Sequence, residues 1–595
     1  MPIPPAAAPR PQPVNPPVWA ALAGIAIGLP MLLAFNAPPS STFLNQAAAL
    51  IGWGSWLTVL ASCLAGPSWR PGNAGTGALQ AALLLLGLAA LVSPLWAALP
   101  WSLSLSSVGL IAAAMLAAQT GAALQREGLA LAAFRAFCIG LVVAAALSSL
   151  IGLLQVFAPT WPDGNWIARS YVPGRAVGNM RQPNHLSSLL LWAIVAVVWL
   201  GEAGVLRRWL GTALALLFVF VVVLSASRTG AVSMLMLTVW AVLDRRLSRS
   251  ARWLLGLAPL IYLGFWYGTG AWADYTHHVF GGETRFNTQG DISSSRWGIW
   301  SNTLTLIRMH PWAGVGFGEF NFAWTLTPFP GRPVAFFDHT HNLILQFVVE
   351  LGIPLAAVVL ALLGYALVLA LRGALLARAA EHAPPGQALL RPAAFAMVLL
   401  ILVHSLLEYP LWYSYFLLPA AFAFGLCLAG PAAEHAASRP VAGVGRPLQI
   451  AAMVLMVGGM ASVLDYARVV VIFAPPEGAP GLAQRIVDGR KSVFFAHHAD
   501  YAAATTSEHP ADVMPAFLRS PHYLLDARLL QAWATALDQG GDTEHARYLA
   551  QRLREFRNAQ SADFFAACEP PARPGVKPPF QCVAPTRTLG FEDFR

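Results

Sequence analysis

Residues 129–157 read LALAAFRAFCIGLVVAAALSSLIGLLQVF, an apolar run that a single charged residue, Arg135, interrupts. At a rise of about 1.5 Å per residue, a helix of this length exceeds the roughly 30 Å of hydrocarbon in a bilayer. Lipid offers no hydrogen-bond partner to backbone groups, so such a run crosses a membrane as a helix. The stretch therefore predicts a transmembrane protein.

The remainder of the chain repeats this pattern. Of its 595 residues, 57% are hydrophobic and 11% are charged, whereas ordinary soluble domains have about 25% charged residues. We therefore expect an all-α, polytopic membrane protein with about thirteen transmembrane helices. Their approximate ranges are 18–36, 45–65, 78–98, 103–123, 129–157, 185–201, 208–224, 229–243, 253–270, 342–371, 392–408, 411–430 and 448–472.

The positions of arginine predict the orientation, because short cytoplasmic loops keep positive charge. Inner loops would hold Arg126 and Arg207, while the outer hairpin near 99–102 holds no arginine. We expect a multi-pass protein of the bacterial inner membrane with a cytoplasmic N-terminus and a periplasmic C-terminus. Its predicted parts are a cytoplasmic tail (1–17), a transmembrane catalytic domain (18–472) with periplasmic loops 158–184 and 271–341, and a periplasmic helical domain (473–595).

The predicted C-terminal domain has helical periodicity between Tyr523 and Phe556. Apolar residues recur at helical spacing on both sides of a break at residues 539–542. This pattern is typical of a small helical hairpin of the tetratricopeptide type. Cys568 and Cys582 flank a proline-rich stretch, and they are candidates for a periplasmic disulfide, with two free thiols as the alternative.

Several arginines lie on the side where the charge rule expects few. We interpret Arg169, Arg285 and Arg332 as ordinary charges of translocated loops. Arg228 differs, because it lies between two apolar spans with small residues around it, where an uncompensated guanidinium is expensive. Arg296 opens a helix-like stretch in the second outer loop. A planar guanidinium donates two hydrogen bonds to one anion, so Arg228 and Arg296 are candidates for holding a phosphate.

Two polar clusters accompany these arginines at the outer ends of predicted spans. In residues 179–185, Asn184 is expected to cap the sixth span after Pro183. The other cluster, residues 408–415, is rich in tyrosine and tryptophan, and taken alone it is typical of an interfacial aromatic belt.

A third cluster contains two histidines, His339 and His341, ahead of the tenth span, with Glu350 deeper in the same span. Their i, i+2 spacing is not the i, i+4 spacing of a helical metal site. A general base or electrostatic helper is the better interpretation for one of them, and we expect no metal.

Taken together, these motifs resemble the O-antigen ligase and polymerase (WaaL/Wzy_C) superfamily. They are Gln182-Pro183-Asn184-His185, Ser227-Arg228-Thr229-Gly230, Arg296 followed by His310-Pro311-Trp312-Ala313-Gly314-Val315-Gly316, and His339-Thr340-His341-Asn342 ahead of Glu350-Leu351-Gly352. Within the superfamily, the block Glu408-Tyr409-Pro410-Leu411-Trp412-Tyr413 and the extra C-terminal tail look like the bacterial O-oligosaccharyltransferases of the PglL type. The resemblance covers roughly residues 20–560.

The resemblance also implies which residues form the site. The catalytic residues would be Arg228, Arg296 and one histidine, either His341 or His339. The substrate-binding residues would be Gln182, Asn184, Arg181, Asn342, Glu350 and Tyr409, with Tyr413 as the alternative to Tyr409.

Proteins of this type transfer a glycan en bloc from undecaprenyl pyrophosphate to Ser or Thr of a periplasmic acceptor protein, such as a pilin or a lipoprotein. Ligase members use lipid A-core as the acceptor, and polymerase members use another lipid-linked repeat. We therefore expect a metal-independent, inverting glycosyltransferase that works among membrane lipids, with no cofactor and no nucleic-acid partner. A flippase for the same lipid is the alternative from another class, but the sequence lacks the paired half-repeats typical of transporters.

Overall fold

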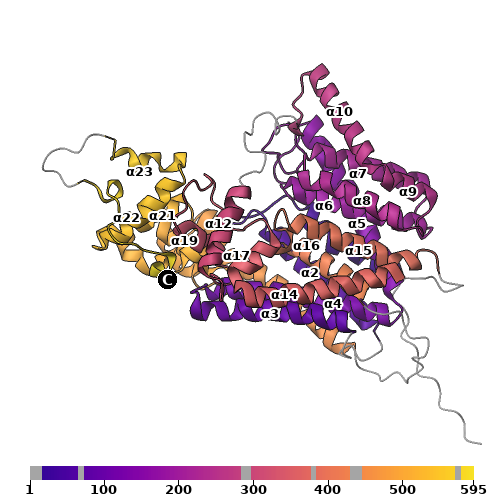
Figure 1. Cartoon of the computed structure of the whole chain (residues 1–595), viewed down its shortest axis with the longest axis horizontal. Helices are drawn as coiled ribbons and strands as arrows, with labels where there is room; N and C mark the ends of the chain where they lie inside the picture. Colours follow the sequence, from indigo (N-terminus) through magenta and orange to yellow (C-terminus); the bar gives the residue numbers. More distant parts are fainter. Residues whose placement is uncertain (1–15, 65–72, 283–295, 377–383, 429–444, 570–577) are drawn as a thin grey trace, which may run out of the picture.

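The computed structural model describes residues 16–64, 73–282, 296–376, 384–428, 445–569 and 578–595. The predicted cytoplasmic tail therefore lies outside the described residues apart from Pro16 and Pro17, and so does Arg285. Within the described ranges the chain is helical and contains no strand (Figure 1). The prediction of an all-α fold is confirmed.

Each predicted span overlaps an observed helix. These helices are α1 (Pro16–Leu32), α2 (Phe43–Ser62), α3 (Ala74–Trp96), α4 (Trp101–Arg126), α5 (Ala130–Phe157), α6 (Pro183–Glu202), α7 (Arg208–Leu224), α8 (Arg228–Leu243), α10 (Ala258–Thr276), α14 (Leu343–Leu376), α15 (Gln387–Ser405), α16 (Ser414–Leu428) and α17 (Arg446–Phe473). Seven described helices are long and apolar enough to cross a bilayer alone, and α10 forms a further candidate with α9 (Arg249–Gly256) across a 48° bend. The protein is a multi-pass membrane protein, and the count of thirteen spans stays a prediction.

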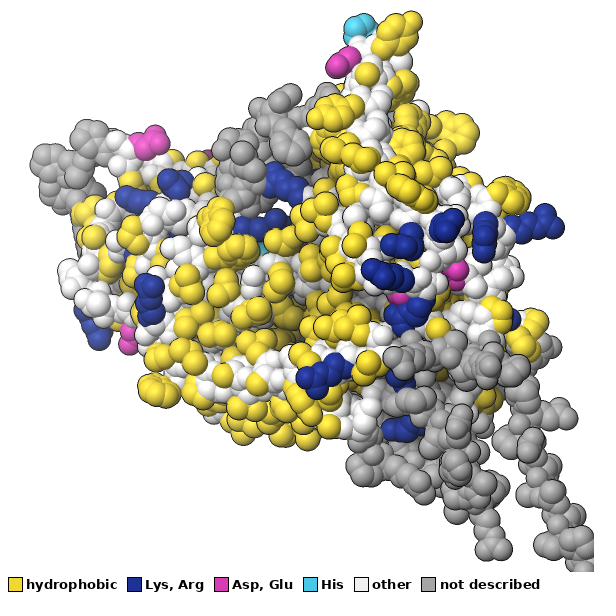
Figure 2. All heavy atoms as spheres, turned by 45° about the vertical axis from the view of Figure 1, so that its right-hand side comes forward, with side chains coloured by type: hydrophobic (Ala, Val, Ile, Leu, Met, Phe, Trp, Pro, Cys, Tyr) yellow, Lys and Arg dark blue, Asp and Glu magenta, His cyan; other side chains and the backbone are white. Residues whose placement is uncertain are grey.

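The outside of the helix bundle is apolar. Figure 2 shows hydrophobic side chains over the broad middle of the molecule. Leu84 of α3, Val358 of α14 and Val454 of α17 each expose half or more of their surface. In water such a surface would be unfavourable, whereas in a bilayer it contacts lipid of the same polarity.

α6 is the most enclosed of the long apolar helices, with 94% of its apolar window buried. Its two indole groups, on Trp192 and Trp199, donate to the carbonyls of Met397 and Gly386 at 2.9 and 3.0 Å. Burying these N–H groups therefore leaves neither of them without a partner. The enclosed helix therefore holds the residues at its N-terminal end in a fixed position.

α14 is broken at Gly352, which has φ 75° and ψ 163°. Residues 311–316, which we call the strap, cross the break, and the amide of Ile353 donates to the carbonyl of Pro311 at 2.8 Å. Backbone groups freed inside a membrane need partners of this kind. A Cβ atom on Gly352 would lie 2.2 Å from the carbonyl oxygen of Trp312, so the contact requires glycine.

The described residues after α17 form a lobe at one end of the bundle, coloured orange to yellow in Figure 1, which we call the C-terminal lobe. Its helices are α18 (Leu482–Gly489), α19 (Ala496–Thr506), α20 (Met514–Phe517), α21 (Ala527–Gln539), α22 (Thr543–Glu555) and α23 (Ala562–Ala566). α21 and α22 form a hairpin around the predicted break, while the tetratricopeptide likeness stays a prediction. Cys568 and Cys582 form a disulfide.

The segment of residues 296–342 lies between the lobe and the bundle (Figure 1). It contains α12 (Arg296–Met309), the strap and α13 (Phe320–Leu326). It ends in residues 337–342, which we call the histidine loop because they include His339 and His341. The fold thereby brings this loop beside the N-terminal end of α6.

Candidate active site

A single carboxylate, that of Glu408, joins two of the predicted site residues. Its Oε2 lies 2.8 Å from Nδ1 of His341, and its Oε1 accepts a hydrogen bond from Nη2 of Arg296 at 2.8 Å. The three side chains belong to the loop after α15, the histidine loop and the first turn of α12. Residues more than a hundred positions apart in the sequence therefore meet at one point.

Glu408 is ionised in this setting. Burial opposes its ionisation, but the hydrogen bond from His341 and the charges of His341 and Arg296 outweigh burial and lower the pKa of Glu408 to about 2. An ionised carboxylate only accepts hydrogen bonds, so Nδ1 of His341 carries a proton. In the neutral form of the imidazole, Nε2 is then the nitrogen with a free lone pair, as a general base requires.

Asn184 connects this carboxylate to the α8 terminus that carries Arg228. Its Nδ2 donates to Glu408 Oε1 at 3.1 Å, and its Oδ1 accepts from the hydroxyl of Ser227 at 2.7 Å. Ser227 also caps α8 by accepting from the amide of Gly230 at 3.0 Å. Arg228 is the first residue of α8, so the structure brings it to the same end of the bundle as His341.

The N-terminus of α6 corrects one expectation. The cap is Gln182, whose side-chain oxygen accepts from the amides of Asn184 and His185, and it is not Asn184. Pro183 fits the first helical position because it has no amide hydrogen to satisfy. The prediction that Asn184 caps α6 was wrong. Its side-chain amide instead bonds to Glu408 on one side and to Ser227 on the other, so it connects three segments of the chain.

The two histidines of the loop have different surroundings. His339 lies 3.1 Å from Asp338 without the alignment of a hydrogen bond, and its ring stacks on Tyr409 at 4.3 Å between centroids. His341 makes an aligned hydrogen bond with Glu408 and meets Tyr409 edge to face at 5.1 Å. The geometry favours His341 as the base and Tyr409 as the aromatic residue between the two rings.

Tyr409 and Tyr413 both keep their phenol protons. Burial, and then the charge of Asp338, raise the pKa of Tyr409 far above its ordinary value, and the same causes raise the pKa of Tyr413 to about 12. The rings of the two tyrosines stack at 6.1 Å, and Tyr413 contacts the ring of His185 at 4.7 Å. Both phenols are therefore neutral, and the two side chains are hydrogen-bonded to each other.

Two predicted residues form hydrogen bonds with backbone atoms rather than with Glu408. Arg181 donates to the carbonyls of Ser41 and Gly164 at 3.4 and 3.3 Å. Asn342 accepts from the first amides of α14, and its Nδ2 donates to the carbonyl of Leu406, 3.2 Å away. Both side chains hold the backbone of loops that reach the site.

Glu350 is buried behind the histidine loop rather than beside Glu408. It accepts from Nε2 of Gln346 at 2.9 Å, and Gln346 in turn accepts from the amide of Thr340 at 2.8 Å. Thr340 lies between the two histidines. Glu350 therefore supports the loop from the membrane side.

Backbone strain accompanies three of these segments. Arg181, Ala226 and His341 have positive φ angles of 55°, 49° and 54°, a region that residues other than glycine seldom adopt. Such conformations cost free energy and persist only where the surroundings enforce them, which is common at functional sites. Arg181 directly precedes Gln182, Ala226 lies two residues before Arg228, and the third strained residue is His341 itself.

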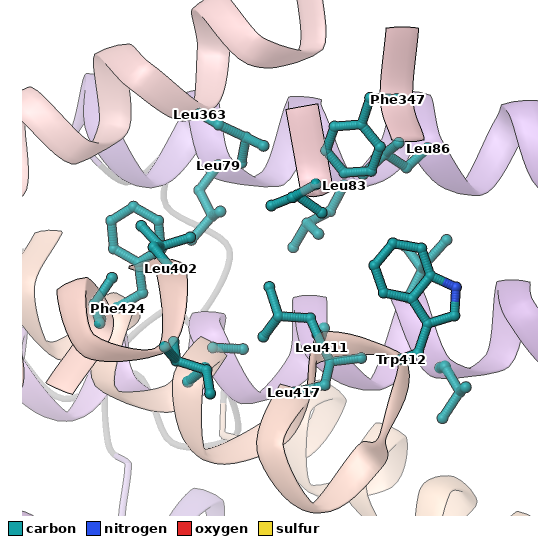
Figure 3. A pocket seen from close by; sticks show the side chains of 18 of the residues that line it. Leu79, Leu83, Leu86, Phe347, Leu363, Leu402, Leu411, Trp412, Leu417 and Phe424 are labelled. Carbon is teal, nitrogen blue, oxygen red and sulfur yellow. The ribbon is translucent and has the colours of Figure 1, made fainter. Parts of the chain in front are cut away.

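An apolar cavity of about 210 Å³ opens beside the site, among α3, α4, α14, α15 and α16 (Figure 3). Leu79, Leu83 and Phe424 are among the residues that line it. Trp412 lines the cavity, and its ring lies 4.9 Å from the ring of His339. A narrow apolar chain in this cavity would end next to the histidine loop.

Models of three families match the chain. The O-antigen ligase family matches residues 213–360, which hold Arg228, Arg296 and His341. A protein glycosylation ligase family matches residues 176–200, and the C-terminal region of a virulence factor membrane-bound polymerase family matches residues 392–566. The resemblance to the O-antigen ligase superfamily is confirmed.

Two curated proteins of Acinetobacter baylyi sharpen this resemblance to the superfamily. A general O-oligosaccharyltransferase is 27% identical over 319 residues, covering 51% of this chain and 52% of that protein. A ComP-specific O-oligosaccharyltransferase is 23% identical over 263 residues, covering 42% of this chain and 44% of that protein. The chain thus spans about half the length of the curated relatives it matches, and it is consistent with a PglL-type member of the O-antigen ligase superfamily.

Sequence reasoning did not identify Glu408 as the centre of the site. Taken alone, its cluster was typical of an aromatic belt, and the family resemblance assigned a role there only to Tyr409 or Tyr413. A carboxylate at the end of a predicted span was itself a signal, because an ionisable group there is expensive. Ser227 was quoted within a motif and given no role. What the sequence could not supply was the pairing of Glu408 with His341 and Arg296.

Proposed function

We propose that this chain is a glycosyltransferase that moves a preassembled glycan en bloc from undecaprenyl pyrophosphate to Ser or Thr hydroxyls of periplasmic proteins. The observation that carries the proposal is the Glu408 carboxylate, which holds His341 and Arg296 at one end of a membrane helix bundle. The names of the two Acinetobacter relatives support the same reaction class. In this proposal the site faces the periplasm of a bacterial inner membrane, with the N-terminus in the cytoplasm and the C-terminal lobe in the periplasm.

The two arginines would hold the pyrophosphate of the donor. Only one nitrogen of Arg296 is engaged by Glu408, so the guanidinium keeps further donors for a second anion. Arg228, at the N-terminus of α8, adds a fixed charge to the partial positive charge of the helix end. Together they would stabilise the negative charge that grows on the pyrophosphate as it leaves.

His341 would activate the acceptor. Its Nε2 takes the proton of the Ser or Thr hydroxyl, while Glu408 stabilises the imidazolium that forms. The hydroxyl oxygen bonds to C1 of the first sugar as the bond from C1 to the phosphate oxygen breaks, with inversion at C1. Undecaprenyl pyrophosphate leaves with the bonding electron pair, and His341 later releases its proton to water.

Other residues would shape the substrate sites. Tyr409 and Tyr413, as neutral phenols, would donate to the phosphate or the first sugar, and Gln182 and Asn184 would fix the loop that lines it. The first isoprene units of the donor would lie in the apolar cavity next to Trp412. Its volume of about 210 Å³ is below the roughly 300–1,000 Å³ of typical small-molecule sites, so most of the chain would remain in the bilayer.

In this proposal His339, Arg181, Asn342 and Glu350 support the site through the contacts described above. We also propose that the reaction needs no metal, because the leaving group is already activated as a pyrophosphate and two guanidinium groups supply positive charge. Chelation in a purified assay should therefore leave transfer intact.

The proposal can be tested in a cell that makes a lipid-linked glycan and a periplasmic pilin or lipoprotein. Expression of the chain should add the glycan to that protein, detected by mass spectrometry, and His341→Ala and Arg228→Ala should abolish the product. Arg308→Ala is the matched control, because Arg308 lies on α12 with Arg296 but is exposed. Full product from both site variants would overturn the proposal.

The match to the O-antigen ligase family favours one other function, transfer of the glycan to lipid A-core. The same cells distinguish the two functions, since glycan would then appear on lipopolysaccharide and the acceptor protein would stay unmodified. A flippase would produce neither product.

A further inference from the structure

We infer that the C-terminal lobe holds the histidine loop in its working position, and that Asn321 is the positioning residue that joins them. The inference rests on the proposed function for its activity readout. Asn321 belongs to α13, and 7% of its surface is exposed. Its hydrogen bonds place it where α13 meets the lobe on one side and the start of the histidine loop on the other.

The amide of Asn321 bonds to the lobe on one side and to the loop on the other. Its Oδ1 accepts from the backbone amide of Leu525 at 2.9 Å, and its Nδ2 donates to the carbonyl of Phe337 at 2.8 Å. The partners fix the orientation of the amide, because one offers only a donor and the other only an acceptor. The bond to Leu525 is buried and the bond to Phe337 is partly buried, so losing either would leave a polar group with little access to water unsatisfied.

Phe337 transmits this position to the histidines. Its ring meets the ring of His341 edge to face at 5.5 Å and that of Trp324 at 5.8 Å. The next residue, Asp338, lies 3.1 Å from Nδ1 of His339. A shift of the Phe337 backbone would therefore move both histidines relative to Glu408.

The chain before Phe337 is fixed to the lobe as well. The guanidinium of Arg332 lies 3.2 Å from Glu555 and 4.5 Å above the ring of Phe556, and its side chain is fully buried. Phe336 stacks on the same Phe556 ring at 3.9 Å. The structure thus corrects our reading of Arg332 as an ordinary loop charge, because it anchors the segment that leads into the histidine loop.

Asn321→Asp tests the inference most directly. An ionised carboxylate still accepts from Leu525 but cannot donate to Phe337, so the bond to the lobe remains and the bond to the loop is lost. We expect kcat to fall about 100-fold, the size of effect that a misplacement of about 1 Å produces. The KM for the donor should remain unchanged, because the arginines that hold it do not contact Asn321.

Tyr548→Phe is the matched control. Its hydroxyl donates to the carbonyl of Leu326 at 2.7 Å, so it joins the lobe to α13 but not to the histidine loop. The control should lose the same kind of buried hydrogen bond and keep its kcat. An equal loss of kcat in both variants would overturn the positioning role, because general loosening of the interface would then explain it.

Hydrogen exchange of the full chain supplies a readout independent of activity. The amide of Thr340, bonded to Gln346, should exchange faster in Asn321→Asp than in the wild type and in Tyr548→Phe. If Asn321→Asp does not fold, Phe336→Leu weakens the same connection and should show the same signature. Wild-type exchange and wild-type kcat in a folded Asn321→Asp or Phe336→Leu variant would contradict the inference. If the wild-type protein shows no transfer but the variants show the expected exchange pattern, only the proposed function is contradicted.

Discussion

Among the described residues, a partly buried pair of histidine and glutamate can be compared with a fully buried one, and the two behave differently. His341 and Glu408 lie 2.8 Å apart with 16% and 13% of their side chains exposed, while His522 and Glu319 lie 2.6 Å apart with 1% and 0% exposed. Arg296 also contacts Glu408. The site pair is therefore open on one side and has a third, positively charged partner, whereas the pair between α13 and the lobe is sealed.

The surroundings determine the charge of each carboxylate. Burial acts on both, but the hydrogen bond and charges around Glu408 outweigh it, whereas burial dominates at Glu319 and raises its pKa. The second oxygen of Glu319 has no hydrogen-bond partner among the described residues. In the proposed function the first pair serves proton transfer, whereas the second joins the lobe to the N-terminal end of α13.

The largest effect is expected when the imidazole of His341, the more exposed of the two histidines, is removed. His341→Ala should lower the transfer rate by about 10²–10⁴-fold, because a positioned general base contributes about that much. Purified enzyme with a synthetic lipid-linked donor gives the rate. His339→Ala should have a smaller effect, and a larger effect at His339 would reverse the assignment of the base.

A smaller loss of kcat is expected when the pair of His341 and Glu408 keeps its shape but Glu408 loses its charge. Glu408→Gln retains a hydrogen-bonding group beside His341 but no longer stabilises the imidazolium, and kcat should fall about 10²-fold, as for other preorganised electrostatic groups. Comparing kcat with the KM for the donor measures the effect. Unchanged kcat would mean that Glu408 only holds the loops together.

The sealed pair should affect stability rather than chemistry. His522→Ala leaves the buried Glu319 carboxyl without its partner, and breaking a buried pair in this way costs about 3 kcal/mol. Thermal unfolding of the lobe in detergent should show the loss, while transfer well below the unfolding temperature is largely retained. A large drop in rate without a change in unfolding would place His522 in the chemistry.

The smallest effect concerns pH. The lowered pKa of Glu408 means that its contribution to stability is complete above the ordinary carboxyl pKa of about 4.5 and is lost as the pH falls towards about 2. The difference in melting temperature between the wild type and Glu408→Gln should therefore be constant from neutral pH down to about 5 and shrink below that. A difference that shrinks between pH 7 and 6 would show that Glu408 titrates there.

Much of this arrangement was predictable from sequence patterns. Apolar runs such as residues 129–157 locate helices because lipid imposes one solution on the backbone. The motifs around Arg228, Arg296 and His341 were predicted to share one face, and the chain of contacts from Ser227 through Asn184 to Glu408 brings them to one end. These are properties of local composition and of topology.

Long-range pairings were not predictable. Glu408 lies 67 residues from His341 and 112 from Arg296, and no periodicity links such positions. Arg332 has the sequence context of a loop residue, and only its distant partner Glu555 makes it part of an interface. Asn184 is the residue type that usually caps a helix, and tertiary contacts engage its amide elsewhere and leave the longer Gln182 side chain as the cap.

The strap across the broken helix α14 has a consequence for how the protein is assembled. At Gly352 and at Gly314 a methyl group would overlap backbone atoms of the other segment, so the two glycines form a reciprocal backbone contact. A substitution at either position is expected to prevent insertion or maturation of the chain, long before any substrate is met. Labelling and cysteine-scanning campaigns should therefore treat these two positions as a single joint and leave both untouched.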